Sequence, residues 1–531
     1  MNPFRDLTFG ASLRHLAATF GRREALVFKG RRWKFSDVKD EVDAAARRLG
    51  TLGLSQGDKV ALWLPNRPEF LWYWLAAGQI GLVAVMLNTR LKREEATYQL
   101  GQSDSRAVIL PGPGAFRDFL GEVMAIRADL PKLRHVVALD PPGPGAAAHI
   151  LDWSGATDPS LPLPEEARDP EAPVLIAYSS GTTALPKGAM LTHCLFRKAW
   201  DHGPRFGQTE DDRLFLCVPL FGILSTVNGV LTFWSRGSAV VLTERFEPRE
   251  ALQLLQEERC TAAYLLPLML DQMLAEPDFR KFDLSRLRTG IVVATDPAVL
   301  RRAASELGMH GLITSFGMTE TSSAVTRTFA SDPLEVRATS HGTELPDIEV
   351  RVADPETNAP LPDDTYGELQ VRGYCVMKGY YNKPEETARS FTPDGWFKTG
   401  DGGVRRADGT FQFQRRLKDG YKYNGFNVST PEVEAVLSQH PEVQAVAVFG
   451  LPDRSHGEVG TAFVIPRPGT AIRLDPSSVI EFLKPRLASY KIPKHVFVVE
   501  EFPLTAGTGK VQKFKLREIA EARLAGAVDH A

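Results

Sequence analysis

A loop rich in serine, threonine and glycine has the residue types needed to hold a phosphate chain. It runs Tyr178-Ser-Ser-Gly-Thr-Thr-Ala-Leu-Pro-Lys-Gly188 and follows an apolar stretch, Val174 to Ala177, that is typical of a buried strand. Small residues let backbone N–H groups and hydroxyls approach phosphate oxygens, and Lys187 adds positive charge. The usual P-loop places Gly before its lysine and Ser or Thr after it, but Pro186 and Gly188 occupy those positions here. We therefore predict a phosphate-holding loop of another type.

A second segment offers oxygen ligands for a metal ion. The stretch Ser315-Phe-Gly-Met-Thr-Glu320 ends in a hydroxyl and a carboxylate, and a hard cation such as Mg²⁺ takes oxygen ligands beside a triphosphate. Taken alone, a Thr-Glu pair is more often a helix cap than a metal site. Thr319 and Glu320 become candidates because of the segments that accompany them.

Three more segments place charged residues in short, glycine-containing stretches. They are Asp394-Gly-Trp-Phe-Lys-Thr-Gly-Asp401, Arg416-Leu-Lys-Asp-Gly-Tyr-Lys-Tyr-Asn-Gly-Phe-Asn427 and Pro503-Leu-Thr-Ala-Gly-Thr-Gly-Lys510. Alone, they would be interpreted as a tight turn, a solvated hairpin and a solvent-facing lysine. Their order along the chain favours another interpretation.

In this order, the five segments resemble the signatures of the adenylate-forming superfamily, which includes acyl-CoA synthetases, nonribosomal-peptide adenylation domains and firefly-type luciferases. The resemblance extends from about residue 10 to about residue 520. It implies an enzyme that activates an organic acid with ATP as an acyl adenylate and then transfers the acyl group to coenzyme A. The small-molecule acid, ATP and CoA would be its partners, with Mg²⁺ as the metal.

The resemblance assigns the chemistry to four residues. Lys510 would bridge the acid's carboxylate and the α-phosphate as negative charge builds in the transition state. Thr319 and Lys187 would contact phosphate, and Glu320 would hold Mg²⁺. The residues expected to contact ATP or AMP are Ser179, Ser180, Gly181, Thr182, Thr183, Lys187, Ser315, Phe316, Gly317, Thr319, Asp401 and Arg416.

Two departures from the family pattern affect these expectations. Phe316 replaces the commoner Tyr, so the ring can still lie against adenine while a hydroxyl contact is lost. The segment before Lys510 is one residue longer than usual, with Gly507 as the apparent insertion. Asp401 is expected to accept hydrogen bonds from the ribose hydroxyls, because a carboxylate can accept two such bonds.

The resemblance also divides the chain into an N-terminal adenylate-forming domain, residues 1–415, and a mobile C-terminal lid, residues 416–531. Lys418 would be the hinge about which the lid rotates. Lys422 and Asn427 would face the adenylate or the thioesterification site, and Gly425 would leave room for pantetheine because glycine permits close backbone approach. Monomer and homodimer both stay open.

The acyl pocket is expected in segments that are mostly apolar. Its candidate residues are Phe221, Gly222, Thr226, Val292, Val293, Ala294 and Met318. Many relatives carry His where this chain has Gly222, so the glycine opens space in the pocket. Many also carry Gly-Gly where this chain has Val292-Val293, so the two valines fill space. A medium-chain fatty or aromatic acid fits this lining, since each buried methylene contributes about 0.8 kcal/mol. These segments contain no basic residue positioned to bind a second carboxylate. The alternative to an acyl pocket is that the residues simply pack the core.

Three other functions are compatible with the same motifs. The chain could load a carrier-protein phosphopantetheine arm instead of CoA, because the thiol is the same. It could also be a luciferase-like monooxygenase, or a relative that only binds nucleotide. The presence of Lys187, Glu320, Asp401 and Lys510 disfavours the binding-only alternative.

The elements that must position these residues form an α/β pattern. A helix is predicted from Ser36, as its cap, to Gly50, then a strand over 59–64, a helix from Pro68 and a strand over 82–87. Such alternation predicts a largely parallel sheet. The Pro- and Gly-rich region 111–173 is interpreted as a surface excursion.

The predicted fold class is α/β, with a large N-terminal body of parallel and mixed sheets flanked by helices. A second α/β pattern fills 174–348, and a glycine-rich β section follows to about Phe413. The remainder predicts a small α+β domain, with helices over 431–437, capped by Thr430, and 478–487, and strands over 443–449, 459–465 and 496–499.

Composition excludes several classes of protein. Lys plus Arg number 63 against 65 Asp plus Glu, and no long basic run is present, so nucleic acid is not an expected partner. The four cysteines contain no CxxC pair, which disfavours a disulfide framework or a structural zinc site and predicts reduced, mostly buried thiols. The charged N-terminus lacks the apolar core of a secretory signal, and no uninterrupted apolar run could span a membrane. A cytoplasmic enzyme is therefore expected.

Overall fold

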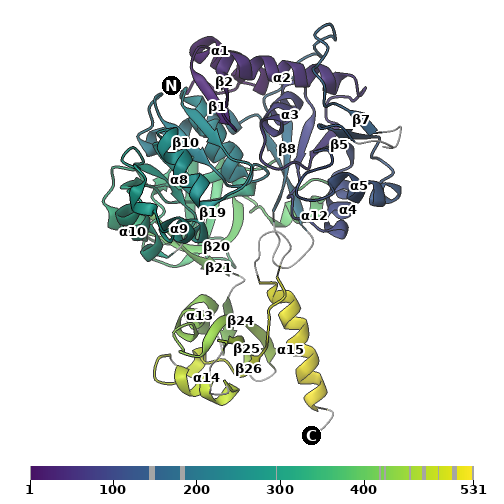
Figure 1. Ribbon diagram of the computed structural model, residues 1–531. Coiled ribbons are helices and arrows are strands. Elements are labelled where there is room, and N and C mark those ends of the chain that lie inside the picture. The colour runs from purple at the N-terminus through teal and green to yellow at the C-terminus, as the bar shows by residue number, and fades with distance from the viewer. Residues whose placement is uncertain are drawn as a thin grey trace.

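The computed structural model shows a large N-terminal body and a smaller C-terminal unit that follows strand β21 (Figure 1). The residues that the structure describes are 2–142, 150–179, 186–294, 296–417, 420–423, 426–453, 456–468, 474–487, 489–504 and 511–528. Two seven-stranded sheets dominate the large body, as the α/β pattern predicts.

The first sheet has the strand order β7-β6-β5-β3-β4-β8-β9. Its strands are β3 (Lys59–Leu62), β4 (Val83–Met86), β5 (Ser105–Leu110), β6 (His135–Ala138), β7 (Ile150–Asp152), β8 (Pro173–Ser179) and β9 (Lys187–Thr192). All neighbours are parallel except β8 and β9, which are antiparallel. Helices α3 (Pro68–Gln79), α4 (Arg93–Gln102) and α5 (Phe119–Ile126) connect strands of this sheet.

The interpretation of region 111–173 as a surface excursion is wrong for much of its length. It contributes helix α5 and the strands β6 and β7, which extend the first sheet. The apolar run of β6, His135–Ala138, is only four residues long and lies among Pro- and Gly-rich stretches. Because turn-forming residues dominate the composition of this region, the strand was not predicted. Val136 and Val137 are nevertheless completely buried.

The second sheet has the order β14-β13-β12-β10-β11-β1-β2 and is parallel apart from the β1–β2 hairpin. Its strands are β1 (Glu24–Phe28), β2 (Arg31–Lys34), β10 (Arg213–Leu216), β11 (Ala239–Leu242), β12 (Ala262–Leu265), β13 (Thr289–Val292) and β14 (Gly311–Leu312). The accompanying helices are α1 (Phe9–Phe20), α2 (Phe35–Gly50), α6 (Leu195–His202), α7 (Thr232–Ser235), α8 (Pro248–Glu257), α9 (Pro267–Leu274), α10 (Pro297–Glu306) and α11 (Leu334–Thr339).

One hydrophobic core joins the two sheets. It contains Leu62 of β3 and Leu216 of β10, and it includes the fully buried indoles of Trp74 and Trp234. Helix α2 packs against α1 and α3 over this core. The helix begins at Phe35 rather than after a Ser36 cap, because the Asp37 carboxylate accepts a 2.8 Å hydrogen bond from the Lys34 backbone and closes the first turn.

Shorter antiparallel sheets follow the second large sheet. Strands β15 (Ser315–Met318), β16 (Ser323–Arg327) and β17 (Thr343–Glu344) form one of them, and β18 (Ile348–Ala353), β19 (Gly367–Gly373), β20 (Phe397–Arg405) and β21 (Phe411–Arg416) form the other. Helix α12 (Pro384–Arg389) lies between β19 and β20 in the chain. The predicted glycine-rich β section is therefore confirmed.

The C-terminal unit has its own sheet and core, as predicted. Its elements are β22 (Gly420–Tyr423), β23 (Phe426–Ser429), α13 (Thr430–Leu437), β24 (Val443–Asp453), β25 (Gly457–Pro466), α14 (Pro476–Leu483), β26 (His495–Val498) and α15 (Lys513–Val528). Helix α14 begins two residues earlier and ends four residues earlier than predicted. Asp475 is the reason for its early start, because its carboxylate accepts a 2.7 Å bond from the Ser478 backbone.

Two predictions about the whole chain can be compared with these elements. All four cysteines are free thiols, with Cys217, Cys260 and Cys375 buried and Cys194 half-buried, as predicted. Across the described part of the chain, no helix has the length and apolar character needed to cross a membrane.

Candidate active site

The predicted phosphate loop connects two antiparallel strands. Ser179, the last residue of β8, pairs with Lys187, the first residue of β9, and Tyr178 pairs with Gly188. A P-loop would lead into a helix, whereas this loop leads into a strand. Since β8 is a strand of the parallel part of the sheet, the loop follows its carboxyl end, which is where α/β sheets bind ligands.

The segment 378–381 pairs with the outer edge of β9. The Lys378 N–H donates to Met190 O at 3.0 Å, and the Met190 N–H donates to Gly379 O at 3.0 Å. The Tyr381 N–H donates to Gly188 O at 2.9 Å. Gly188 admits no side chain here, because an added Cβ would lie 2.6 Å from Ile176 Cγ2. The close pairing places Tyr380 beside Lys187.

Lys187, Tyr380 and Glu320 form one chain of contacts. The Lys187 ammonium lies 3.3 Å from Glu386 of α12 and 4.4 Å from the centre of the Tyr380 ring. The Tyr380 hydroxyl donates a 2.9 Å bond to the Glu320 carboxylate, and both side chains are buried. Burial and the neighbouring Glu320 raise the pKa of Tyr380, so its hydroxyl keeps its proton at neutral pH. The predicted lysine and carboxylate are therefore connected through a tyrosine.

The turn that carries Glu320 is unusually constrained. It is the helix η5 (Thr319–Thr321), and it contacts both β8 and β9. The Thr321 hydroxyl donates to Ser323 O at 2.8 Å and accepts a 3.1 Å bond from the Met318 backbone. Ser322 and Ser323 have φ of 52° and 95°, a conformation that costs on the order of 1 kcal/mol or more for non-glycine residues. Such strain is common at functional sites.

Asp401 lies in β20, where its backbone is directly opposite Arg416 of β21. It is 5% exposed. The Asp401 N–H donates to the Thr399 hydroxyl at 3.0 Å, and the Gly400 N–H donates to the Glu368 carboxylate at 3.0 Å. The strand pairing thus brings together the two residues that the resemblance assigns to ribose and phosphate.

Phe316 lies in an apolar cluster that also contains Leu369 of β19 and Phe411 of β21. Its ring is 5% exposed and stacks on Phe413, with ring centroids 5.8 Å apart and planes at 16°. One face of the ring is therefore occupied by protein. A contact between the ring and adenine stays a prediction.

The expected acyl-pocket residues lie in two different packing environments. Phe221 and Met318 pack at the rim of the core between the large sheets, and the Thr226 hydroxyl donates to Gly222 O at 3.1 Å. A Cβ added at Gly222 would contact only Pro219 O, at 3.5 Å, so space is open beside this glycine. Ala294 packs at the edge of the core of the second sheet.

The valine pair is divided between core and surface. Val292 is 2% exposed and packs in the core of the second sheet, whereas Val293 is 46% exposed. All four residues of β13, Thr289–Val292, are buried, and Val293 is the first residue after the strand ends. The core-packing alternative therefore holds for Val292, and a pocket-filling role stays a prediction for Val293.

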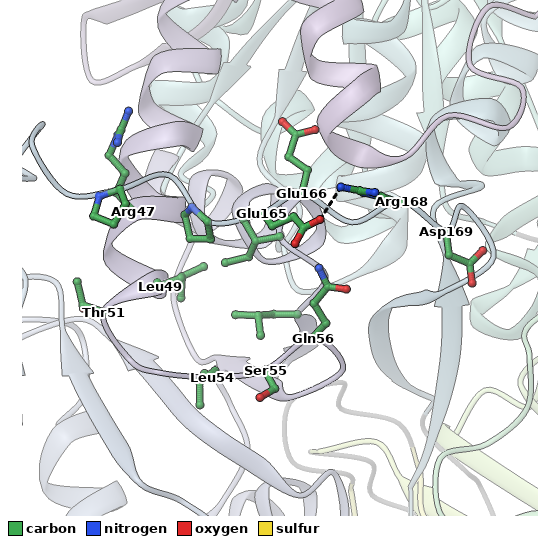
Figure 2. Close-up of a pocket in the computed structure, with 15 residues that line it drawn as sticks. Arg47, Leu49, Thr51, Leu54, Ser55, Gln56, Glu165, Glu166, Arg168 and Asp169 are labelled. Atoms are coloured by element: carbon green, nitrogen blue, oxygen red, sulfur yellow. Dashed lines mark hydrogen bonds and ion pairs between the residues drawn. The ribbon is translucent and has the colours of Figure 1, made fainter.

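A separate cavity of about 890 Å³ lies between α2 and the loop that contains Glu165 and Arg168 (Figure 2). Figure 2 shows an ion pair between these two residues, at 2.7 Å, and Arg47 and Gln56 also line the cavity. Gln56 precedes β3, so the cavity lies at the amino ends of the parallel strands. Ligands of α/β sheets bind at the carboxyl ends, and none of the predicted site residues lines this cavity. It is not the catalytic site.

Comparison with known proteins decides the family. The sequence model of the AMP-binding enzyme matches residues 13–381, and that of the AMP-binding enzyme C-terminal domain matches residues 432–510. The chain belongs to the AMP-binding enzyme family. This membership confirms the resemblance found in the motifs.

Several relatives of this AMP-binding enzyme are similar over nearly their whole length. A putative acyl-CoA synthetase, YngI, from Bacillus subtilis is 32% identical, over 96% of each chain. The mitochondrial medium-chain acyl-CoA ligase ACSF2 of Homo sapiens is 31% identical, over 97% of this chain and 88% of its own. The structure of the anthranilate CoA ligase AuaEII in complex with anthranoyl-AMP superposes with a TM-score of 0.81, at 28% identity over 98% of both chains.

These findings establish the class of reaction. The chain is an AMP-forming acid–CoA ligase, and its substrates are a small-molecule carboxylic acid, ATP and CoA. The fold agrees with those of the solved adenylate-forming enzymes, including an ATP-bound MatB from Rhodopseudomonas palustris with a TM-score of 0.81, at 28% identity over 97% of this chain and 99% of its own.

For several predicted site residues of this AMP-binding enzyme, the sequence is the only basis of the prediction. Ser180, Gly181, Thr182, Thr183, Lys418, Gly425 and Lys510 lie outside the described residues. Ser179, Arg416, Lys422 and Asn427 are described as members of β8, β21, β22 and β23. The roles of these residues stay predictions.

The structure also brings polar side chains to the site that sequence analysis did not select. Tyr380 and Glu386 are two of them, and the short aromatic segment Gly379-Tyr-Tyr-Asn382 is the sequence feature that could have indicated Tyr380. Lys198 and Arg327 are charged residues that sequence analysis also did not select, and both are completely buried. Arg327 ends the otherwise uncharged strand Ser323-Ala-Val-Thr-Arg327, and that contrast was its weak signal.

Proposed function

We propose that this ligase activates an acid with a hydrophobic body, of medium chain length or aromatic, and that Lys187, Tyr380 and Glu320 organise its ATP site. The observation that carries the proposal is the contact chain among these three residues, because it joins the phosphate loop to the turn of Glu320. The names of two relatives, a medium-chain acyl-CoA ligase and an anthranilate CoA ligase, agree with these substrate classes.

In the first half-reaction, a carboxylate oxygen of the acid attacks the α-phosphorus of ATP. A new O–P bond forms, and the bond from the α-phosphorus to pyrophosphate breaks. Lys510 and Lys187 supply positive charge to the oxygens on which negative charge develops. Asp401 and Arg416 hold the ribose, so that the α-phosphate is kept in place for the attack.

Glu320 fits the role of a magnesium ligand. It is a buried carboxylate with one oxygen fixed by Tyr380, and it lies in a turn next to β8 and β9. Within the described ranges, no three His, Cys, Asp or Glu side chains converge on a metal position. Mg²⁺ commonly binds through one or two carboxylates with phosphates and water, which suits a single glutamate. When bound, the ion would neutralise phosphate charge.

In the second half-reaction, the CoA thiolate attacks the acyl carbonyl carbon and AMP leaves with the electron pair of the anhydride bond. Rotation of the C-terminal unit about Lys418 withdraws Lys510 and brings Gly425 to the thiol. Strand β21 ends at Arg416 and β22 of the C-terminal unit begins at Gly420, so a hinge at Lys418 would lie between the two units.

The acid's hydrophobic body occupies the space beside Gly222. Phe221 and Met318 are partly buried at the rim of the main core, so an apolar chain or ring would extend the packing there. Each methylene transferred from water would contribute about 0.8 kcal/mol.

The test is to incubate the purified protein with ATP, Mg²⁺ and a panel of fatty and aromatic acids. Pyrophosphate release is followed with hydroxylamine as a trap, and AMP and thioester formation are followed with CoA. Acid-dependent pyrophosphate, lost in Lys510→Ala, together with CoA-dependent thioester would support the proposal. Pyrophosphate without CoA thioester would redirect the search to a carrier protein, and no turnover with any medium-chain or aromatic acid would refute the substrate class.

A further inference from the structure

One face of helix α6 presents basic side chains to the protein interior. Lys198 and His202 are four residues apart and therefore neighbours on one face of the helix, and both are completely buried. Both His202 ring nitrogens have no hydrogen-bond partner among the described residues, and the Lys198 ammonium has one such contact there, with the Cys375 thiol. The thiols of Cys194 and Cys375 lie near Lys198, but a thiol is a weak acceptor and does not compensate an ammonium charge.

Arg327, at the end of β16, adds a guanidinium to the same region. It is completely buried, donates a 2.5 Å bond from Nη2 to Asn228 Oδ1, and lies 5.0 Å from the centre of the Phe206 ring. Its Nε and Nη1 atoms have no partner in the described part of the chain. The guanidinium is therefore held on one side, and its Nε and Nη1 atoms present three N–H groups to another acceptor.

The charges around this basic cluster, formed by Lys198, His202 and Arg327, do not balance. The nearby carboxylate is Asp201, which already accepts bonds from Asn2 at 2.9 Å and from Tyr374 at 2.7 Å. Arg205 adds a further positive charge, and its guanidinium donates to Arg327 O and to Glu344 O. A buried charge without a partner is strongly destabilising, so the cluster is a place where an anion would be stabilised.

The pKa values of the three basic side chains are lowered by their burial. Burial lowers the pKa of Lys198 and holds that of His202 well below its usual value. Burial also lowers the pKa of Arg327, to about 10, which leaves the guanidinium charged at neutral pH. Arg327 is thus the permanent cation of the cluster.

The basic cluster adjoins the expected acyl pocket. Asn228, which holds Arg327, lies in the helix η3 (Leu224–Leu231), one turn deeper than the half-buried Leu224. Helix α6 and strand β16 both contact η3. Strand β16 starts just after the turn of Glu320, and its four residue steps to Arg327 span about 13 Å.

A bulge in the β15–β16 pair places Arg327 on the same face of β16 as Ala324. Residues directly opposite in an antiparallel pair share a face. Arg327 is opposite Ser315, and Ala324 is opposite Gly317, because the register shifts between Phe316 and Gly317. Without the shift, strict alternation would place Ala324 and Arg327 on opposite faces. The two residues therefore lie on the face that carries Ser315 and Gly317, opposite to the face of Phe316 and Met318.

We infer that the basic cluster binds a second anionic group, a carboxylate, at the far end of the acid that this ligase activates. The substrate class is then a dicarboxylic acid with an apolar middle, of which one carboxylate reacts with ATP and the other pairs with Arg327. The inference rests on the proposed function, and it qualifies the expectation from sequence, because Lys198 and Arg327 come from outside the segments expected to line the acyl pocket.

The test compares acids of equal length that differ only at the far end. Linear dicarboxylic acids from succinate to dodecanedioate, the corresponding monocarboxylic acids and the ω-hydroxy acids are assayed for acid-dependent pyrophosphate release with saturating ATP. We expect the best dicarboxylate to exceed its monocarboxylate in kcat/KM by about tenfold or more, because the site's buried polar groups are otherwise left unpaired.

Variants then assign the preference to the cluster. Arg327→Met should lower kcat/KM for the dicarboxylate roughly 100-fold and change that for the monocarboxylate by less than about threefold. Arg327→Lys should keep part of the preference. Arg301→Met, at an exposed arginine of α10 paired with Glu335, is the control and should change neither value. If Arg327→Met does not fold, Lys198→Met gives the same comparison.

The outcomes separate this inference from the proposed function. The inference is overturned if monocarboxylates or ω-hydroxy acids are turned over at least as well as dicarboxylates and if Arg327→Met leaves the ratio of their kcat/KM values unchanged. The proposed ligase function would survive that result. If no acid supports pyrophosphate release, the anion site is tested by measuring Tm with each dicarboxylate of the series in the absence of ATP and CoA. A rise in Tm in the wild type that is absent in Arg327→Met supports the anion site, and equal behaviour of the two proteins refutes it.

Discussion

Two buried polar regions of this ligase differ in how their charges are matched. At the phosphate loop, Lys187 lies against Glu386 and Tyr380, and Tyr380 donates to Glu320. In the basic cluster, the free N–H groups of Lys198 and Arg327 face no carboxylate of their own among the described residues. The first region is satisfied before any substrate binds, whereas the second becomes satisfied when an acceptor arrives.

The difference indicates a division of work along one strand and its preceding turn. Glu320 and Arg327 belong to the same short segment, η5 followed by β16. A preorganised network suits the reacting end, where transition-state charge must be stabilised without rearrangement. An unmatched cation suits the far end, where it discriminates between acids. Four substitutions test this division, and we describe them from the largest expected effect to the smallest.

Glu320→Gln should have the largest effect. The amide keeps the size of the side chain and can still accept the Tyr380 hydrogen bond, but it removes the negative charge proposed to hold Mg²⁺. We expect adenylation, measured as acid-dependent pyrophosphate release, to fall about 100- to 1,000-fold. Glu385→Gln, on the exposed face of α12, is the matched control. A variant within threefold of wild type would remove Glu320 from the reacting end.

Lys187→Met tests the other end of the satisfied network. Loss of the ammonium should lower kcat/KM for ATP roughly 10- to 100-fold, because a positive charge near the phosphates is removed while the volume is kept. Lys378→Met is the control, since Lys378 lies in the segment that pairs with β9 but forms an exposed ion pair with Glu171. Equal losses in the two variants would show that general surface charge, not the position of Lys187, matters.

Gly222→Leu places bulk at the mouth of the acyl pocket without a backbone clash, because an added Cβ meets only Pro219 O at 3.5 Å. We expect KM for the acid to rise about tenfold and KM for ATP to stay constant. Gly155→Leu is the control, since nothing lies within 4 Å of a Cβ added there. An equal change in both KM values would argue that Gly222 supports the fold rather than the pocket.

Arg327→Met should have the smallest effect when no substrate is present. Replacing a buried, unmatched cation by an apolar side chain of similar size is neutral or stabilising, so we expect Tm to stay constant or to rise by about 2 °C. Thermal unfolding of the ligand-free variants measures this. A fall of several degrees would mean that the Asn228 hydrogen bond makes Arg327 a structural residue, and the contrast between the two regions would disappear.

Much of the site was predictable because its residues act within short segments. The loop that ends at Lys187, the turn of Glu320 and the strand of Asp401 each combine residue types that suit one ligand group. The adjacent apolar runs also predicted β8 and the alternating elements before it. Glu320 and Lys187 could be proposed as site residues without knowledge of how their segments meet.

Other features depend on contacts that no local pattern records. Strand β6 was missed because its apolar run is four residues long and lies among turn-forming residues. Val292 and Val293 were treated as one pair, although the end of β13 separates them into core and surface. The relation of Lys198 to Arg327 depends on the packing of α6 and β16 around η3, and neither segment alone contains it.

The position of β1 in the second sheet has a consequence for the order of synthesis. Leu26 of β1 pairs with Val240 of β11, and the Trp234 indole donates to Ala25 O, a residue 209 positions earlier in the chain. At about 5–20 residues per second, the ribosome takes roughly 10 to 40 s to make β11 after β1. During that time the β1–β2 hairpin has an open strand edge, to which chaperones or neighbouring nascent chains can bind. Protease digestion of ribosome-stalled chains that end before and after β11 should show protection of residues 24–34 only in the longer chains.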